Sequence, residues 1–312
     1  MQTEKIILGA NTKYPLNGIL TLPDQTGISF PAVVFVHGSG ASNMDEKVGR
    51  LTPFKDLAEG LASYGIASLR YDKRSFAHGL KMLKEKECCT VKEETITDAL
   101  LATELLRMDS RIDPKKIFLI GHSMGGMLAP RIDAEGGDYC GLVLLAGSPR
   151  TLEEIMLEQT AEVLPQVSKL LQWILKKQIR KLSATFAAIS SMSDEDAKKT
   201  KVGNGVTLYY FKEMSRYPVS GYLKNLQKPI LILQGEKDFQ VKADKDFTRY
   251  QQLLEGKSNA SFKLYPNLNH AFVPSVYGSI SKARQEYNVE QHIGEEVISD
   301  IAAWILCAAG NA

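Results

Sequence analysis

The sequence predicts an α/β fold in which helices cover both faces of a mostly parallel sheet. Short runs rich in valine, isoleucine and leucine recur along the 312 residues. Such nearly continuous apolar runs are typical of strands that are buried on both faces. Amphipathic stretches separate the runs, and strands that alternate with helices form parallel sheets.

Eight segments have the composition of strands. Residues 5–9 and 17–23 come first and could form an antiparallel pair. The other six are expected to be buried strands: PAVVFVHG (31–38), IASLRYD (66–72), KIFLIG (116–121), GLVLLAG (141–147), PILILQG (229–235) and SFKLYP (261–266).

Three stretches between or after these strands predict helices. Residues 53–65 have apolar side chains at helical spacing, with proline at the start and glycine at the end. Thr90 and Glu93 fit a capping box, which would open a helix that runs to about residue 108. The last helix is expected at about 293–306.

One region, residues 151–226, interrupts the alternation of strands and helices. It contains no clear strand, an amphipathic stretch at 164–182 and an aromatic cluster at 209–211. We therefore expect an α/β core formed by residues 1–150 and 227–312. Residues 151–226 are expected to be a helical cap inserted between two strands of that core.

The composition excludes several classes of protein. Hydrophobic residues make up 44% and charged residues 24%, with a net charge of +2. A nearly neutral chain gives no electrostatic support for binding nucleic acid or an anionic membrane. The N-terminus resembles no signal peptide, and no apolar run approaches membrane-spanning length. We expect a cytoplasmic monomer or homodimer.

The four cysteines are not arranged as a metal site or a disulfide framework. Cys88 and Cys89 are adjacent, and Cys140 and Cys307 stand alone. These spacings fit neither a zinc knuckle nor a set of disulfide bonds. Reduced thiols and the absence of a bound metal are therefore expected.

A candidate nucleophile follows the strand at 116–121. Gly121-His122-Ser123-Met124-Gly125 matches G-x-S-x-G, the pattern of a sharp strand-to-helix turn that exposes a serine hydroxyl. The two glycines remove side chains that would clash in such a turn. The following helix N-terminus favours developing negative charge. Ser123 is therefore the predicted nucleophile.

A serine needs a base to accept its proton, and histidine is the usual one. His270 follows the last predicted strand, so it returns to the same sheet edge as Ser123. It is the predicted base. The other four histidines are expected in structural, pocket-wall or surface positions: His37, His78, His122 and His292.

An acidic side chain is needed to orient the histidine and to stabilise its charged form. Asp238 lies just beyond the carboxyl end of a predicted strand and is the first choice, with Glu236 as the alternative. Asp72 also follows a strand. Because Lys73 and Arg74 are beside it, a structural salt link is expected for Asp72.

Acyl transfer also requires donors for an oxyanion. We assign these to the backbone N–H groups of Met124, directly after the nucleophile, and of Ser39 in the HGSG turn. The glycines of that turn allow the backbone to approach a substrate. The expected substrate contacts are Gly38, Gly40, His122, Tyr209 and Tyr210. The two tyrosines would either contact an apolar acyl or aryl group or only pack the inserted region.

The chain resembles the α/β-hydrolase superfamily over nearly its whole length. The resemblance rests on segments that occur in order: VVFVHGSG, FKDLAEGLASYGIASLRYDKR, IDPKKIFLIGHSMGG, PILILQGEKDFQV and LYPNLNHAF. The order Ser123, Asp238, His270 also agrees with this superfamily. More narrowly, HGSG, Asp45-Glu46 and RYDKR resemble bacterial carboxylesterases related to dienelactone hydrolase and prolyl oligopeptidase. The stretch ASNMDE after HGSG departs from that group's pattern.

The resemblance implies an eight-stranded sheet, an acyl-enzyme on Ser123, no cofactor and a cap over the acyl pocket. The expected activity is hydrolysis of small carboxylic esters with short acyl or aryl groups. Thioester or acyl-peptide hydrolysis by the same triad is an alternative. A non-catalytic role in binding a small ligand is a further one, because a fold does not establish an activity.

Overall fold

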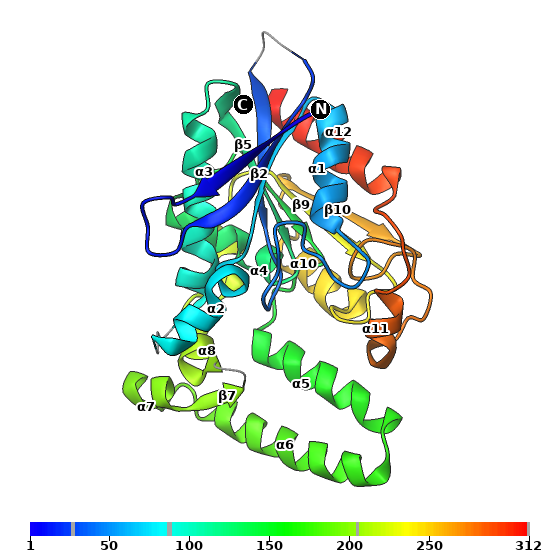
Figure 1. Cartoon of the computed structure of the whole chain (residues 1–312). Helices are drawn as coiled ribbons and strands as arrows, with labels where there is room; N and C mark the ends of the chain where they lie inside the picture. Colours follow the sequence, from blue (N-terminus) through cyan, green and yellow to red (C-terminus); the bar gives the residue numbers. More distant parts are fainter. Residues whose placement is uncertain (26–28, 86–88, 204–205, 311–312) are drawn as a thin grey trace.

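The centre of the molecule is an eight-stranded sheet (Figure 1). The computed structural model describes residues 1–25, 29–85, 89–203 and 206–310. The sheet has the order β1-β2-β4-β3-β5-β6-β9-β10. Its strands are β1 (Gln2–Leu8), β2 (Leu16–Leu22), β3 (Phe30–Val36), β4 (Ala67–Tyr71), β5 (Ile112–His122), β6 (Gly141–Leu145), β9 (Ile230–Gly235) and β10 (Ala260–Tyr265).

The sheet is mostly parallel, as predicted. β2 is antiparallel to both β1 and β4, and the remaining neighbours pair in parallel. Parallel strands place their carboxyl ends at one edge, where ligands bind in open α/β sheets. The loops that follow β3, β5, β9 and β10 therefore converge, and these loops contain Ser39, Ser123, Asp238 and His270.

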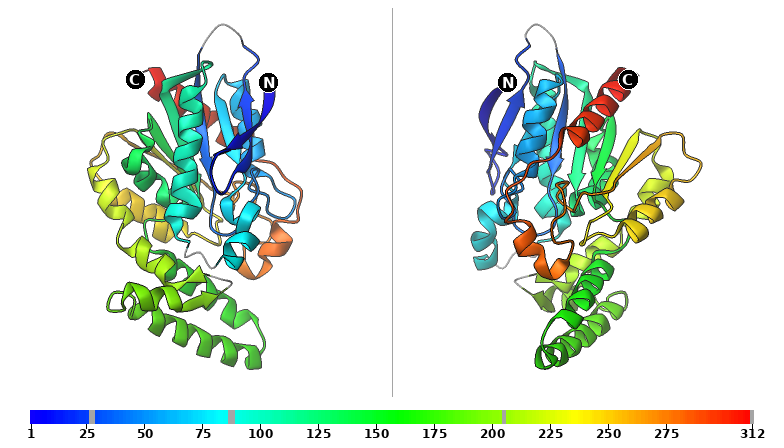
Figure 2. Two further views of the ribbon diagram at one scale, coloured as in Figure 1. Left: turned by 60° about the vertical axis from the view of Figure 1, so that its left-hand side comes forward. Right: turned by 90° about the vertical axis from the view of Figure 1, so that its right-hand side faces the viewer.

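Helices cover both faces of the sheet (Figure 2). On one face, α1 (Pro53–Ser63) and α12 (Glu295–Gly310) pack on Val33 and Phe35 of β3. On the other, α3 (Thr97–Met108) and α4 (Met124–Ile132) pack on Val34 and Val36. Because side chains alternate along a strand, a strand that is apolar throughout supplies both cores.

Shorter helical elements connect these layers. They are α2 (Arg74–Lys84), η1 (Lys92–Ile96), η2 (Asp133–Gly137), η4 (Ala243–Phe247), α10 (Thr248–Leu253), η5 (Ile280–Lys282) and α11 (Ala283–Glu286). The predicted helix at 90–108 is a π-helical turn, η1, followed by α3.

Only half of the predicted capping box at Thr90 forms. The Glu93 carboxylate accepts from the Thr90 N–H at 2.8 Å, but the Thr90 hydroxyl accepts from the Lys92 N–H. A complete box, which the sequence analysis missed, joins Thr151 and Glu154 at the start of α5.

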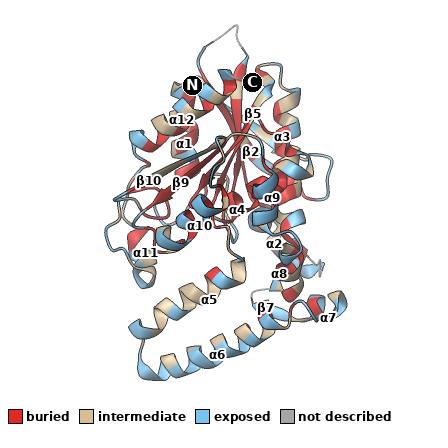
Figure 3. Cartoon of the chain, turned by 180° about the vertical axis from the view of Figure 1, so that it is seen from behind, coloured by how far each residue is buried: buried red, intermediate tan, exposed pale blue. Residues whose placement is uncertain are grey.

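Residues 151–226 lie between β6 and β9 in the chain, and most of this inserted segment projects beyond the carboxyl edge of the sheet (Figures 1 and 3). Because α9 packs against α4, the projecting part is α5 to α8. The helices are α5 (Leu152–Val163), η3 (Leu164–Gln166), α6 (Lys169–Ala187), α7 (Asp194–Lys199), α8 (Leu208–Ser215) and α9 (Val219–Asn225).

The expectation that this segment contains no strand is wrong. β7 (Lys201–Gly203) and β8 (Val206–Thr207) pair as a short antiparallel sheet. The two strands have only three and two residues. They are too short for a period-two pattern of apolar residues to stand out in the sequence.

Within the described part of the chain, no helix is both long enough and apolar enough to cross a membrane. The same residues contain no cluster of three or more potential metal ligands. Cys89, Cys140 and Cys307 are free thiols, and Cys88 lies outside the described residues.

Candidate active site

Ser123 lies at the turn between β5 and α4 in a strained backbone conformation. Its φ is 54° and its ψ is −115°, a region that non-glycine residues rarely adopt. A Cβ on Gly121 would lie 2.3 Å from the carbonyl oxygen of Gly125. A Cβ on Gly125 would lie 2.1 Å from the carbonyl oxygen of Val36. Both glycines are therefore required by the close approach of backbone segments around the serine.

His270 is held by Asp238. Its Nδ1 lies 2.7 Å from Oδ2 of Asp238, and both residues are buried. The carboxylate also accepts hydrogen bonds from the backbone N–H groups of residues 240 and 241 and from the side-chain amide of Gln234. Glu236, the alternative acid, is exposed. The structure thus places Asp238, not Glu236, beside the imidazole.

Ser123 and His270 line one cavity. It has a volume of about 190 Å³, and its walls include Gly38, Ser39 and His122. A Cβ on Gly38 would lie 3.2 Å from the Cβ of Ser123, so this backbone passes directly beside the candidate nucleophile. The structure therefore brings together the serine, the histidine and the HGSG turn from three separate loops.

A second cavity of about 420 Å³ lies between Ser123 and the inserted segment. The core contributes Ser39, Gly40 and Met124 to its wall. The inserted segment contributes mostly apolar side chains: Leu152, Ile155, Met156, Val202, Val206, Tyr210 and Phe211. A larger cavity of about 650 Å³, beside α4 and α9, contains none of the predicted site residues.

The two adjacent tyrosines predicted to contact substrate lie in different places. Tyr210 lines the second cavity, and its hydroxyl donates to Glu94 and contacts the Met124 sulfur. Tyr209 instead lies beneath the cations Lys198 and Arg216 and is not part of that wall. Consecutive residues on a helix point about 100° apart, so the helix face that presents Tyr210 and Phe211 to the cavity turns Tyr209 away from it.

The buried acidic residue Glu46, which the sequence analysis named only as part of a family motif, lies beside the site. Its Oε1 accepts from the Gly38 N–H at 2.7 Å, and its Oε2 lies 3.0 Å from Nδ1 of His122. The alignment of this second contact falls short of a good hydrogen bond. Nε2 of His122 in turn lies 2.9 Å from the carbonyl oxygen of His270. Glu46 thereby links the HGSG turn to the loop of the candidate base.

The charges of Glu46 and His122 stabilise each other. Burial disfavours the imidazolium, but the nearby carboxylate outweighs it, so the pKa of His122 is raised. Burial likewise disfavours the carboxylate, but His122 outweighs it, so the pKa of Glu46 is lowered. Among the described residues, no carboxylate forms an ion pair with the His37 ring. Burial therefore lowers the pKa of His37 to about 4, although the more distant charge of Glu46 opposes this shift.

The salt link predicted for Asp72 is wrong. The Asp72 carboxylate accepts from the Met44 N–H, whereas Lys73 reaches the carbonyl of Gly38. Arg74 pairs with Asp98 instead. Neighbouring residues at the end of a strand point in different directions, so adjacency in the sequence does not make Asp72 the partner of either cation.

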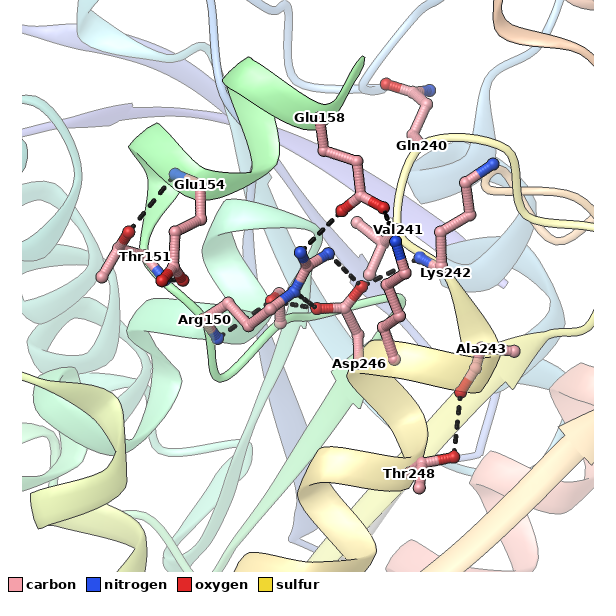
Figure 4. A network of polar contacts seen from close by, with 12 residues as sticks. Arg150, Thr151, Glu154, Glu158, Gln240, Val241, Lys242, Ala243, Asp246 and Thr248 are labelled. Atoms are coloured by element: carbon pink, nitrogen blue, oxygen red, sulfur yellow. Dashed lines mark hydrogen bonds and ion pairs between the residues drawn. The ribbon is translucent and has the colours of Figure 1, made fainter. Parts of the chain in front are cut away.

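Arg150 links the inserted segment to the core (Figure 4). Its guanidinium makes two hydrogen bonds with the buried carboxylate of Asp246 and a third with Glu158 of α5. Lys245 also pairs with Glu158. The first helix of the inserted segment is thus joined to η4 by a network of charges.

The fold is that of the α/β-hydrolase superfamily, as the sequence motifs indicated. Within it, the chain belongs to the serine aminopeptidase S33 family, whose sequence profile matches residues 29–274.

The similar proteins include several esterases. The chain is 33% identical to esterase EstD of Thermotoga maritima over 93% of its own length, but it spans only 65% of EstD. Est1E from Butyrivibrio proteoclasticus matches with a TM-score of 0.59 at 14% identity, covering 98% of this chain and 99% of Est1E. A dienelactone hydrolase from Anabaena variabilis matches with a TM-score of 0.56 at 16% identity, covering 98% and 97%. At these identities the two structures support the fold alone.

Proposed function

We propose that the protein is a serine esterase that hydrolyses small carboxylic esters through an acyl-enzyme on Ser123. One observation carries the proposal. The strained Ser123 shares a cavity with His270, whose Nδ1 is 2.7 Å from Asp238. The similarity to EstD supports an ester substrate.

In this mechanism the Ser123 hydroxyl attacks the ester carbonyl carbon, and Nε2 of His270 accepts its proton. Asp238 keeps Nδ1 protonated and stabilises the imidazolium. The backbone N–H groups of Ser39 and Met124 donate hydrogen bonds that stabilise the negative charge developing on the carbonyl oxygen. The imidazolium then protonates the departing alcohol. A water molecule, deprotonated by His270, then attacks the acyl-enzyme in the same way. The bond to Ser123 breaks, the acid is released, and His270 returns the proton to Ser123.

The apolar wall of the second cavity favours an apolar acyl or aryl group. Ile155, Met156 and Phe211 present side chains that gain free energy when they are removed from water. The cavity lies on the Met124 side of Ser123, and Tyr210 is part of its wall. We assign the acyl group to this cavity and the alcohol to the smaller one, which His270 lines.

The first test is covalent labelling with a fluorophosphonate. Intact mass should show a single adduct on the wild type and none on Ser123→Ala. p-Nitrophenyl esters from acetate to decanoate would then define the acyl length. Matched thioesters and p-nitroanilides distinguish esterase from thioesterase and acyl-peptide hydrolase activity. Folded wild type that neither labels nor turns over any of these substrates would contradict the proposal and favour a ligand-binding role.

A further inference from the structure

Two buried charges of opposite sign hold the backbone on either side of Gly38. The Glu46 carboxylate accepts the N–H of Gly38 at 2.7 Å. The Lys73 ammonium donates to the carbonyl oxygen of the same residue at 2.8 Å. The first contact holds the peptide group that joins His37 to Gly38. The second holds the peptide group that joins Gly38 to Ser39.

Lys73 is buried to an extent that is unusual for lysine. Its side chain is 2% exposed, although it lies in the short connection between β4 and α2. Removing an ammonium from water is costly unless it is paired. Its other partner is Glu94, at 3.4 Å, and the second oxygen of that carboxylate accepts from Tyr210. Lys73 therefore has a defined position, with one donor directed at the backbone and one at Glu94.

The contact with the Gly38 carbonyl determines where the Ser39 N–H points. The two groups belong to one peptide unit, and none of the described peptide bonds is cis. In a trans peptide the carbonyl and the N–H point in opposite directions. With the carbonyl turned to Lys73, the N–H of Ser39 is directed away from it. Ser39 lines both cavities that contain Ser123.

We propose that Lys73 is a positioning residue that orients and polarises the Ser39 N–H as an oxyanion donor. This inference rests on the proposed esterase function. A cation that donates to the carbonyl draws electron density from the peptide unit, which makes its N–H a stronger donor. Glu46 complements it by holding the preceding peptide group. Lys73 does not touch the substrate and acts through the backbone.

The test compares Lys73→Met with Lys73→Arg and the wild type. Losing one oxyanion donor lowers kcat by roughly 10²–10³-fold, and a misplaced group can cost about 10²-fold. We expect Lys73→Met to lower kcat by about 10- to 100-fold with little change in KM. Lys73→Arg retains a cationic donor and should recover part of the loss. Arg74→Met is the matched control, because this neighbouring cation contacts Asp98 and not the HGSG turn.

A second readout separates positioning from a purely structural role. A trifluoromethyl ketone adds to Ser123 and forms a tetrahedral oxyanion, so its affinity reports the oxyanion site. The affinity should fall in proportion to kcat/KM across the Lys73 variants. Folded Lys73→Met that retains kcat within about twofold, or the ketone affinity of the wild type, would overturn the inference. Wild type without labelling or turnover would instead overturn the proposed function.

Lys73→Met leaves Glu94 without its cation and could prevent folding. The double variant Lys73→Met/Glu94→Gln removes both charges and avoids an unpaired buried carboxylate. It should have a lower kcat and a weaker ketone affinity than Glu94→Gln alone. Equal values for these two variants would show that Lys73 contributes nothing to the oxyanion site and would overturn the inference.

Discussion

The two sides of the candidate active site differ in how firmly the chain holds them. On the core side, Asp238, His270, Glu46 and Lys73 are buried, and each contacts backbone or another buried group. On the other side is the inserted segment, whose longest helix, α6, lines neither cavity, has one buried residue, Phe186, and exposes Leu170, Trp173 and other large apolar side chains (Figure 3). The groups proposed to react thus lie among buried residues of the core, whereas one wall of the proposed acyl pocket comes from a segment that is more exposed as a whole.

This contrast implies that the reaction and the substrate preference respond to different substitutions. Changes on the core side should alter kcat or the stability of the whole fold. Changes on the inserted side should alter KM and the preferred acyl length. The predictions below test this separation.

The largest effect is expected for Asp238→Asn. The amide cannot stabilise the imidazolium and favours the wrong tautomer of His270, so kcat should fall on the order of 10⁴-fold. The fold should be retained, because Asn has the same shape and its Oδ1 can still accept the N–H groups of residues 240 and 241. Turnover of p-nitrophenyl acetate and the thermal midpoint measure the two effects.

Glu236→Gln is the matched control, because this neighbouring acid is exposed and makes no contact with His270. Its kcat should equal that of the wild type. If Glu236→Gln lost activity and Asp238→Asn retained it, the acid of the triad would be wrongly assigned.

The next largest effect is the difference in stability that results from replacing each of two glycines by alanine. Gly125→Ala would place a Cβ 2.1 Å from a backbone oxygen of β3 and should lower the free energy of unfolding by at least about 3 kcal/mol. Gly221→Ala in α9 meets nothing within 4 Å and should raise it by up to about 1 kcal/mol. Urea unfolding of both variants checks the pair. Equal effects would contradict the contrast in packing.

A smaller effect is expected for the network in Figure 4. Arg150→Met removes two hydrogen bonds to Asp246 of η4 and one to Glu158 of the inserted segment. We expect KM for p-nitrophenyl hexanoate to rise several-fold while kcat for the acetate stays nearly constant. Lys245→Met, which removes only an exposed contact with Glu158, is the control. A uniform loss of kcat for all esters would place Arg150 with the core-side residues.

The smallest effect is a pH dependence of stability from the Glu46–His122 pair. The pKa of Glu46 is lowered, so its contribution is present above its unfolded value of about 4.3 and is lost as the pH falls through the folded value. The pKa of His122 is raised, so its contribution is present below about 6.5 and is lost as the pH rises through the folded value. The pair should therefore stabilise most between about pH 4.3 and 6.5.

Urea midpoints of wild type and His122→Asn, measured from pH 4 to 9, test this expectation. Their difference should be largest at pH 5–6 and should decrease above that range.

In the inserted segment, the exposed Asp194 pairs with Arg216 and Lys212, which lower its pKa to about 2. Because water and salt screen these two ion pairs, Asp194→Asn should change the urea midpoint far less than His122→Asn does. A difference in urea midpoint between wild type and His122→Asn that stays constant at every pH would contradict the Glu46–His122 pairing.

Much of the fold and the centre of the site could be predicted from local patterns. The eight strands, the mostly parallel sheet and the helices at 53–65 and 293–306 follow from apolar runs and their periods. Ser123 follows from a turn whose sterics demand glycine at both sides, as the contacts of Gly121 and Gly125 confirm. His270 and Asp238 were predicted from their places after strands, and the structure brings them into contact.

The sequence by itself therefore determined the alternation of strands and helices, the elbow and the chemical types available at the sheet edge. These depend on residues close together in the chain. The tertiary structure alone decided that Lys73 turns to Gly38 and not to Asp72, that Glu46 meets His122, and that Tyr210 rather than Tyr209 faces the cavity. The reason is physical: a buried charge or ring takes the partner that long-range packing places within reach, and distance along the chain does not encode that choice.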